Sequence, residues 1–357
     1  MRIAQIAPLH ESVPPKRYGG TERVVSYLTE ELVRQGHEVT LFASGDSVTQ
    51  ARLVPLVERP LRTDPDVRDT VPYLITQIDQ VLDHAADFDV LHFHSDYLAH
   101  CPLVRRLGIP HLTTLHGRLD MPDFRGLFER FASSPMASIS EDQRRPLRQL
   151  PMNWRATVYN GLPEDLYHLQ AQPGKYLAFV GRFSPDKRAD RAIDIAIRAG
   201  IPLRIAAKLD HCDEPWFREH IEPWLRHPLI EYVGEISDAD KDDFLGHAKA
   251  LLFPIDWPEP FGMVMIEALA CGTPVIAFRR GSVPEVIRDG HTGFIVDSIE
   301  EAVAAVSRLD RIDRVHCRRD FEQRFSARRM AEGYVRCYEG LRFGRDTGQA
   351  SPWSQVA

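Results

Sequence analysis

Short apolar runs alternate with amphipathic helical patterns along the chain, and this alternation is typical of βαβ units around a parallel sheet. In the first half, the pattern predicts a strand at residues 2–8, a helix at 22–35 that Gly36 ends, and a strand at 38–43. Further strands are predicted at residues 90–94, 111–115, 136–140 and 157–160, and further helices at 71–86 and 98–107.

A second series of the same kind begins after residues 162–175, which contain Pro163 and Pro173 and are predicted to connect two domains. Its strands are predicted at residues 176–181, 203–207, 230–234, 250–254, 275–278 and 293–296, and its helices at 188–199, 238–249, 262–271, 298–309 and 327–341. The pattern predicts an α/β fold with two Rossmann-like, doubly wound domains, at residues 1–165 and 170–326. A ligand is expected in the cleft between them, at the carboxyl ends of the strands. The helix at about 327–343 is predicted to pack back toward the first domain, and residues 344–357 to form a disordered tail.

The composition is that of an ordinary globular chain of 357 residues, with 43% hydrophobic and 27% charged residues, too long for one comfortable core. A net charge of −7 gives no bulk electrostatic attraction to nucleic acid. The five cysteines are scattered without a CxxC pair, which argues against a disulfide framework or a structural zinc site and favours a reducing cytoplasm. No apolar run of 18 residues predicts a transmembrane helix, while contact with the inner membrane surface stays open.

The most informative stretch is residues 258–274, where two prolines prevent helix formation before Gly262 and Gly272 ends the helix that follows. The first amides of this helix, at Gly262, Met263 and Val264, lack helical acceptors and form a natural diphosphate site. Gly262 also allows backbone and phosphate to approach closely.

Two carboxylates flank this helix start, Glu259 in the loop before it and Glu267 within it. Glu267 lies five residues beyond Gly262, about 7.5 Å along the axis, within reach of a ribose attached to the diphosphate. Glu259 is placed on the other side of the phosphates, where the sugar must lie. The alternative interpretation is a plain loop carboxylate and an exposed helix position.

A second motif follows the first strand of the second half, where Arg182 and Lys187 lie in the predicted strand-to-helix turn. Two cations at the carboxyl end of the sheet would neutralise the charge on a departing nucleoside diphosphate, a role that a metal ion otherwise fills. Ordinary surface cations are the alternative. Because the two cations would take that role, neither a metal ion nor another cofactor is expected.

In combination these motifs resemble the retaining glycosyltransferase family 4, which has the two-domain GT-B architecture. The resemblance rests on the Glu-x7-Glu spacing from Glu259 to Glu267, the Glu-Pro-Phe-Gly opening, the Gly-Arg-x4-Lys turn and the Gly19-Gly20 loop, and covers residues 1–341. It implies that Glu259 contacts sugar hydroxyls and Glu267 the ribose, while Arg182 and Lys187 grip the diphosphate. The donor-binding positions that it implies are Gly19, Gly20, Arg182, Lys187, Lys208, Ile236, Glu259, Phe261, Gly262, Met263, Val264 and Glu267.

His116 matches a family histidine that contacts the donor sugar near the anomeric carbon, whereas a solvated loop histidine is the alternative. With Glu259, Arg182 and Lys187, it completes the predicted catalytic set. His92 and His94, in the strand at residues 90–94, are interpreted as structural.

Three further segments are interpreted at the same level. Lys208 and the loop at residues 235–236 are expected to frame the nucleobase, and residues 281–285 to brace the site. The Asp-rich residues 238–243 are interpreted as a capped, solvated helix start, not a metal motif.

The predicted function is therefore transfer of a hexose, with retention of configuration, from a UDP-sugar to a hydroxyl of a glycan, a lipid-linked glycan or a small molecule. A nucleotide-sugar epimerase or hydrolase on the same fold, and a non-catalytic nucleotide-sugar sensor, are the alternatives. A new glycoside, an isomerised donor or binding without turnover distinguishes the three.

Overall fold

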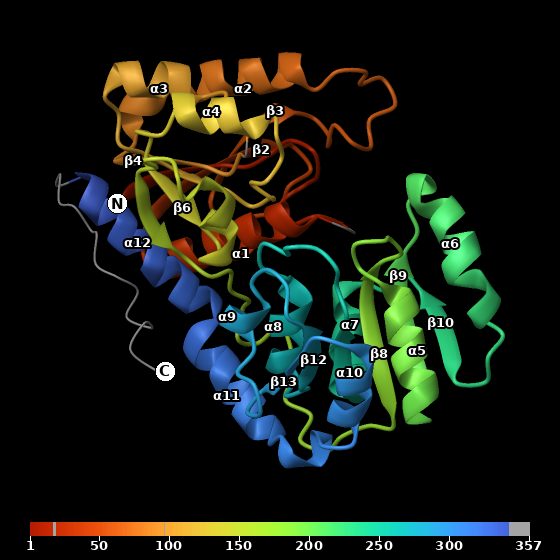
Figure 1. Cartoon of the computed structure of the whole chain (residues 1–357). Helices are drawn as coiled ribbons and strands as arrows, with labels where there is room; N and C mark the ends of the chain where they lie inside the picture. The colour runs from red at the N-terminus through yellow and green to blue at the C-terminus, as the bar shows by residue number, and fades with distance from the viewer. Residues whose placement is uncertain (17–18, 96, 343–357) are drawn as a thin grey trace. The chain divides into compact units, whose positions relative to one another are not determined.

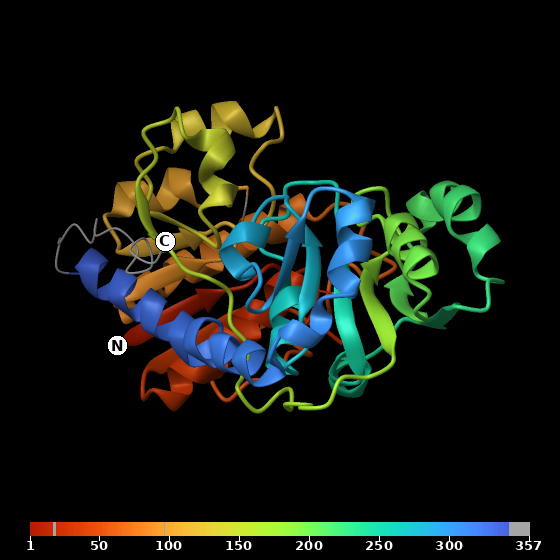
Figure 2. The same cartoon turned by 60° about the horizontal axis from the view of Figure 1, so that its bottom comes forward.

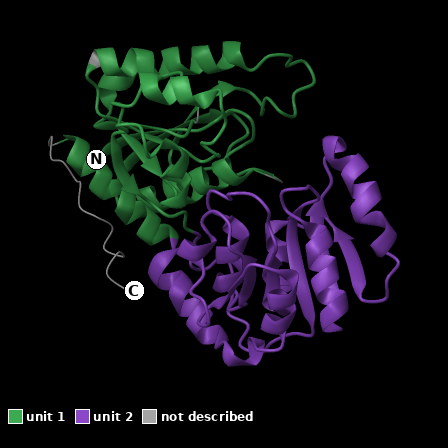
Figure 3. Cartoon of the chain, in the orientation of Figure 1, with its two compact units in different colours: residues 1–161, 327–357 green, residues 162–326 purple. Residues whose placement is uncertain are grey.

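The computed structural model describes residues 1–16, 19–95 and 97–342, so the tail predicted at residues 344–357 lies outside the described residues. The chain divides into two compact units (Figure 3). Unit 1 contains residues 1–161 and the chain from Ala327 onward, and unit 2 contains residues 162–326.

Unit 1 is built on a parallel seven-stranded sheet with the strand order β3-β2-β1-β4-β5-β6-β7. Its strands are β1 (Arg2–Ile6), β2 (Glu38–Ser44), β3 (Arg52–Val57), β4 (Val90–Phe93), β5 (His111–Thr114), β6 (Met136–Ser138) and β7 (Trp154–Thr157). The order reverses between β1 and β4, which is the point where doubly wound sheets bind ligands at the carboxyl ends of their strands.

Helices cover both faces of this sheet, α2, α3 and α4 on one and α1 and α12 on the other (Figure 1). The helical elements are α1 (Gly20–Arg34), α2 (Val71–Asp83), η1 (Ala85–Asp87), α3 (Cys101–Leu107), α4 (Phe124–Arg130), η2 (Asp142–Leu147) and α12 (Ala327–Arg342). Helix α1 buries Val24, Val25, Leu28 and Leu32 at helical spacing, and Gly36 adopts a positive φ of 83° just after its end.

Unit 2 is built on a parallel six-stranded sheet with the order β10-β9-β8-β11-β12-β13. Its strands are β8 (Tyr176–Arg182), β9 (Leu203–Lys208), β10 (Ile230–Gly234), β11 (Ala248–Phe253), β12 (Val275–Phe278) and β13 (Gly293–Val296). The order reverses between β8 and β11, and β11 is nearly continuously apolar because both of its faces are covered.

Helices α5 and α10 pack against one another beside this sheet (Figure 2), and α8 packs against α7 and α11. The helical elements are α5 (Ala189–Ala199), η3 (His211–Asp213), α6 (Glu214–His220), η4 (Glu222–Trp224), α7 (Asp238–Gly246), α8 (Met263–Ala270), α9 (Val283–Val286), α10 (Ile299–Val306), η5 (Leu309–Arg311) and α11 (Arg314–Arg324). Ser237 caps α7 in a capping box with Asp240, as the sequence predicts.

Several elements differ from the sequence prediction. Strand β3 was not predicted, and β7 covers Trp154–Thr157 instead of residues 157–160. Helix α7 ends at Gly246, three residues early, because β11 already begins at Ala248. Among the described residues, no helix is both long and apolar enough to cross a bilayer.

Candidate functional site

The loops after β8 and β11 meet at the point where the strand order of unit 2 reverses. Lys187 lies in the loop after β8 and Glu259 in the loop after β11, and the Lys187 ammonium donates a hydrogen bond to the Glu259 carboxylate. Their side chains are only 20% and 12% exposed, respectively. The sequence predicted both residues at the site, and the structure places them in direct contact.

Aromatic rings surround the Lys187 ammonium on its other sides. Its nitrogen lies 4.9 Å from the centroid of the Trp257 ring and 5.8 Å from that of Phe253. Both are distances at which a ring face attracts a cation. The end of β11 and the loop after it therefore hold Lys187 through a carboxylate and two aromatic rings.

Helix α8 begins at Met263, directly after Gly262, which lies close to the Glu259 side chain. Gly262 has a φ of +77°, and a Cβ there would lie 2.8 Å from Met265 Cε and 3.3 Å from Glu259 Cγ. The backbone angle favours glycine at this turn, and a Cβ would also force Met265 and Glu259 to shift. Phe261, by contrast, is 2% exposed and stacks edge-on against Phe325, so its ring belongs to the core and only its backbone faces the loop.

Glu267 is buried in α8, with 3% exposure, which is inconsistent with the alternative of an exposed helix position. Lys241 of α7 contacts both carboxylate oxygens, at 3.1 and 3.2 Å, and also lies 3.2 Å from Asp238. A buried carboxylate needs such a partner. Lys241 belongs to the segment interpreted as a solvated helix start, so that interpretation was correct for the cap and wrong for this side chain.

Arg182 is the last residue of β8 instead of part of the turn, and pairs in register with Lys208 at the end of β9. Arg182 lies 3.3 Å from Asp213 and 3.6 Å from Asp210, as ion pairs without hydrogen-bond geometry. Lys208 contacts Asp210 at 2.8 Å. The predicted donor-binding cations of unit 2 are therefore paired with carboxylates, and the partners of Arg182 are Asp210 and Asp213, not Glu259.

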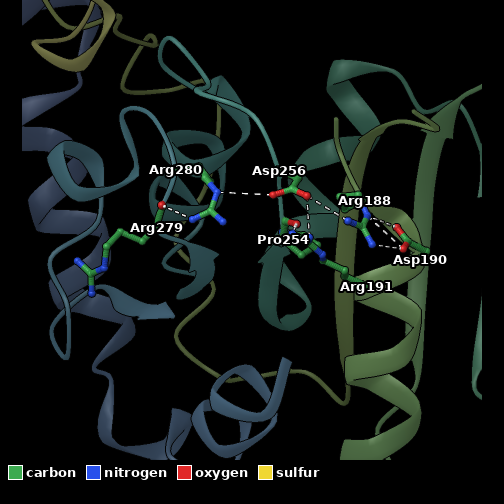
Figure 4. A network of polar contacts seen from close by, with 7 residues as sticks. All are labelled: Arg188, Asp190, Arg191, Pro254, Asp256, Arg279 and Arg280. Carbon is green, nitrogen blue, oxygen red and sulfur yellow. Dashed lines mark hydrogen bonds and ion pairs between the residues drawn. The ribbon is translucent and has the colours of Figure 1, made fainter. Parts of the chain in front are cut away.

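A cluster of arginines around Asp256 fixes the loop that carries Glu259 (Figure 4). The Asp256 carboxylate receives hydrogen bonds from Arg191 at 2.7 Å and Arg188 at 3.2 Å, and lies 3.6 Å from Arg280. Burial raises the pKa of Asp256, but the three arginines more than offset this and hold it below its ordinary value. The Asp256 amide also donates to the Asp186 carbonyl at 2.9 Å, which ties this loop to the one that carries Lys187.

The loop after β12 supports Glu259 from another side. A Cβ on Gly281 would lie 2.3 Å from the Glu259 carbonyl oxygen and 2.4 Å from its nitrogen, so only glycine fits there. Ser282 donates its amide to the Glu259 carbonyl at 3.0 Å and its hydroxyl to the Phe261 carbonyl at 2.8 Å. Residues 281–285 were predicted to brace the site, and Gly281 and Ser282 make contacts of that kind.

The remaining predicted positions lie elsewhere. Ile236 is half-buried between β10 and α7. In unit 1, Gly19 is buried against Pro15, and Gly20 is the first residue of α1. His116 follows β5, where its Nε2 lies 2.9 Å from Nδ1 of His94. The roles predicted for these residues toward a ligand stay predictions.

Sequence reasoning did not predict three side chains that contact predicted residues or fix their loops, Lys241, Asp256 and His94. Lys241 was hidden among aspartates, although Lys is rare in this chain, with six in total. Asp256 and His94 carry no motif that would have identified their partners. Within the described part of the chain, no group of three or more histidine, cysteine or acidic side chains is placed to hold a metal ion.

Comparison with known proteins assigns both halves of the chain. Residues 168–322 match the family model of glycosyl transferases group 1, and residues 18–165 match that of glycosyltransferase family 4. The phosphatidyl-myo-inositol mannosyltransferase of Mycobacterium leprae is 25% identical over 338 residues, which cover 85% of this chain and 86% of that protein. The N-acetyl-alpha-D-glucosaminyl L-malate synthase of Bacillus anthracis is 26% identical over 313 residues, 78% of this chain and 81% of the relative.

Solved structures with the same fold include the Anabaena protein HepE in complex with UDP and glucose, with a TM-score of 0.73. The match is 16% identical and covers 95% of this chain and 99% of HepE. The two family models together span most of the chain, and the two parallel-sheet units have the architecture of the GT-B glycosyltransferases. The chain is a glycosyltransferase that belongs to family 4, the group 1 glycosyltransferases that use nucleotide sugars.

Proposed function

We propose that this glycosyltransferase transfers a hexosyl group from a UDP-sugar, with retention of anomeric configuration, to a hydroxyl of a glycan, a lipid-linked glycan or a small molecule. The observation that carries the proposal is the contact of Lys187 with Glu259 at the point where the strand order of unit 2 reverses. Ligands of doubly wound folds bind at such points. A cation for a diphosphate and a carboxylate for sugar hydroxyls are therefore already adjacent there.

Each group around this contact has a proposed role. The α8 amides from Met263 onward bind the diphosphate, and Glu267 accepts hydrogen bonds from the ribose. Glu259 accepts hydrogen bonds from sugar hydroxyls. Lys187 and Arg182 neutralise the charge that develops on the departing diphosphate, without a metal ion.

Five further positions complete the proposed donor site. Lys208 and Ile236 frame the nucleobase, while Gly19, Gly20 and His116 of unit 1 contact the phosphates and the sugar.

The proposed reaction needs no side-chain nucleophile. The bond between the anomeric carbon and the diphosphate oxygen breaks, and the acceptor oxygen forms its bond on the same face of the sugar. The acceptor proton passes to the departing phosphate oxygen. Positive charge beside that oxygen stabilises the diphosphate as it leaves.

The choice of UDP is supported by the fold shared with HepE, which was solved with UDP and glucose. The names of the two relatives indicate a mannosyl and an N-acetylglucosaminyl group, so they support a hexosyl donor but do not indicate which hexose. Donor identity is therefore the first quantity to measure. A thermal-shift screen across UDP-, GDP- and ADP-sugars detects the donor because a ligand stabilises the folded state by mass action.

The decisive experiment incubates the protein with the stabilising donor and a panel of hydroxyl acceptors, with and without EDTA. A new glycoside with the donor's anomeric configuration supports the proposal. An isomerised or hydrolysed donor without glycoside would replace it by the epimerase or hydrolase, and an inverted product would refute retention.

Two carboxylate variants separate chemistry from binding. Glu259→Ala is expected to abolish most turnover while donor binding persists, whereas Glu267→Ala is expected to weaken donor binding most. Glu300→Ala, an exposed carboxylate on α10, serves as the control. Near-wild-type kinetics of either site variant would contradict the roles assigned here.

A further inference from the structure

Unit 1 contains a continuous chain of hydrogen-bonded polar side chains beneath His116. Three of its elements are neighbouring strands of the sheet, and the fourth is helix α12. Its members are Gln5 in β1, His92 in β4, His94 directly after β4, Thr114 in β5, His116 after β5, and Tyr334 and Tyr338 in α12.

This chain of hydrogen-bonded side chains is almost completely buried. All of its members except His116 are at most 1% exposed. Buried polar atoms of this kind are expected to be satisfied by each other. Each hydrogen in the chain must therefore have a definite donor and a definite acceptor.

The half nearest His116 runs through three contacts. His116 Nε2 lies 2.9 Å from His94 Nδ1, and His94 Nε2 lies 2.7 Å from the Gln5 amide oxygen. The Gln5 amide nitrogen donates to the Tyr338 hydroxyl at 3.1 Å. The amide of Gln5 therefore has its oxygen toward His94 and its nitrogen toward α12.

The other half connects Tyr338 with Tyr334. The Tyr338 hydroxyl lies 2.7 Å from His92 Nδ1, and His92 Nε2 lies 2.7 Å from the Thr114 hydroxyl. Thr114 donates its one hydroxyl hydrogen to Tyr334 at 3.1 Å. Since that hydrogen is used, Thr114 must accept from His92 Nε2, and His92 Nδ1 accepts from Tyr338.

The same assignment of donors and acceptors determines the hydrogen positions in the half nearest His116. The Gln5 oxygen can only accept, so His94 carries its hydrogen on Nε2 and a lone pair on Nδ1. His94 Nδ1 must then accept from Nε2 of His116. All hydrogens point in one direction along the chain, from His116 toward Tyr334.

We infer that His94 is a positioning residue, which fixes His116 as the neutral tautomer with its hydrogen on Nε2 and its lone pair on Nδ1. The tautomer of a ring is set by the hydrogen bond that its other nitrogen makes. His94 in turn is set by the orientation of the Gln5 amide, which α12 holds through Tyr338.

The neutral state of these rings agrees with their burial. Burial lowers the pKa of His116 to about 4 and holds the pKa values of His92 and His94 well below the ordinary value. None of the three rings therefore carries a charge near neutral pH. The donors and acceptors along these hydrogen bonds therefore keep their assignment, because none of the rings takes up a second proton.

One consequence rests on the proposed function, in which His116 contacts the sugar. If that contact is made through Nδ1, this nitrogen acts as a hydrogen-bond acceptor, so the group that it recognises on the ligand is a hydroxyl that donates. The tautomer itself does not depend on this function.

Nitrogen NMR of histidine-labelled protein measures the tautomer directly. His116 is expected to show a protonated Nε2 and an unprotonated Nδ1 at pH 7, with the resonance assigned by its loss in His116→Ala. A proton on Nδ1 of His116 would overturn the inference, whether or not the protein has transferase activity.

Two substitutions of His94 differ in which ring nitrogen they replace. In His94→Asn, the side-chain oxygen occupies the place of Nδ1 and still accepts from His116. In His94→Gln, the amide reaches the place of Nε2 and bonds Gln5, but His116 loses its acceptor. The matched control is His100→Gln, a buried histidine bonded to Thr113 at 2.8 Å outside the chain.

The expected results separate positioning from mere packing. His94→Gln should lower kcat/KM by about tenfold and shift the His116 tautomer, since one neutral hydrogen bond is lost. His94→Asn and the His100→Gln control should retain the tautomer and most of kcat/KM. Equal losses in all three variants, in proportion to their stability, would show a structural role only and overturn the inference. If no donor or acceptor gives turnover in the wild type, the proposed function fails, while the NMR result still decides the tautomer.

Discussion

Lowering the pH from 7 to 5 should destabilise unit 1 much more than unit 2, because the buried histidines of the protein are all in unit 1. His92, His94, His100 and His111 are buried there, whereas none of the seven histidines of unit 2 is buried. Burial lowers the pKa of His100 to about 3 and that of His116 to about 4.

The sign and size follow from linkage. A histidine with a lowered native pKa stays neutral in the folded state, while the unfolded chain takes up a proton below about pH 6.5. Its stabilising contribution is therefore present above that pH and is lost as the pH falls toward the native pKa. Between pH 7 and 5 the loss is about 1.9 kcal/mol for each such histidine.

His100 and His116 alone account for about 4 kcal/mol of lost stability, against a typical total of about 5–15. His92, His94 and His111 add to the loss in the same direction, since burial lowers their pKa values too. Glu22 opposes it, because burial raises the pKa of this carboxyl and its protonation becomes favourable as the pH falls. One opposing carboxyl does not cancel five histidines.

Urea unfolding followed by pulsed hydrogen exchange and mass spectrometry resolves the two units by peptide. The midpoint for the β1, β4 and β5 peptides should fall steeply from pH 7 to 5, and that for the β8 and β11 peptides much less. His100→Gln should remove about 1.9 kcal/mol of this pH dependence in unit 1, whatever its effect at pH 7. An unchanged pH dependence in this variant, or parallel losses in both units, would refute the reasoning.

Three further predictions concern unit 2, each measured by urea unfolding and donor-induced thermal shift. Gly281→Ala should lower the free energy of unfolding by about 2 kcal/mol or more and weaken donor binding, because the new Cβ would clash with the Glu259 backbone. In the control Gly290→Ala, φ is +74° and the space is open, so this variant reports backbone strain alone; equal losses of stability in both variants would contradict the clash. Asp256→Asn should lower the free energy of unfolding by about 2 kcal/mol, because it weakens the charge-assisted hydrogen bonds from Arg188 and Arg191. Asp194→Asn, in an exposed ion pair, should lower it little, and equal losses would argue against a stabilising role of the arginine cluster. Arg314→Met should lower the free energy of unfolding by at least about 3 kcal/mol, because four acceptors lose their buried donor, those of Gln170, Gly246, Ala248 and Thr273. A loss no larger than that of Arg198→Met, at an exposed arginine, would contradict this prediction.

The periodicity of the sequence predicted the strands of both sheets best where apolar residues are consecutive and buried on both faces. Strand β3 was missed because it is only partly buried and contains Pro55, which an edge strand tolerates. Helix α11 was missed for another reason. Its sequence is rich in arginine, and its two buried apolar side chains, Cys317 and Phe321, are too few to form a recognisable stripe; Arg314 and Arg318 donate to backbone carbonyls.

The candidate site was predictable as a set of residue types and less so as a set of contacts. Glu259, Glu267 and Lys187 carry recognisable spacing, and the parallel topology brings the loops after β8 and β11 together. The counterions were not predictable, because Lys241 reaches Glu267 across 26 positions and Lys187 reaches Glu259 across 72. Local pattern contains no information about such partners.

The predicted site residues Glu259 in unit 2 and His116 in unit 1 are held by different physical means. Around Glu259 the support is charged and reaches solvent, through the Asp256 side chain that is 36% exposed, so salt and a bound diphosphate compete with it. Around His116 the support is neutral and buried, so neither salt nor moderate pH above the native pKa values alters it. A polyanionic donor should therefore redistribute the cations of unit 2, while the hydrogen positions of unit 1 stay as the apolar core sets them. Under the proposed function, the charges that can rearrange are those assigned to the leaving group, and the fixed hydrogens are those assigned to the sugar.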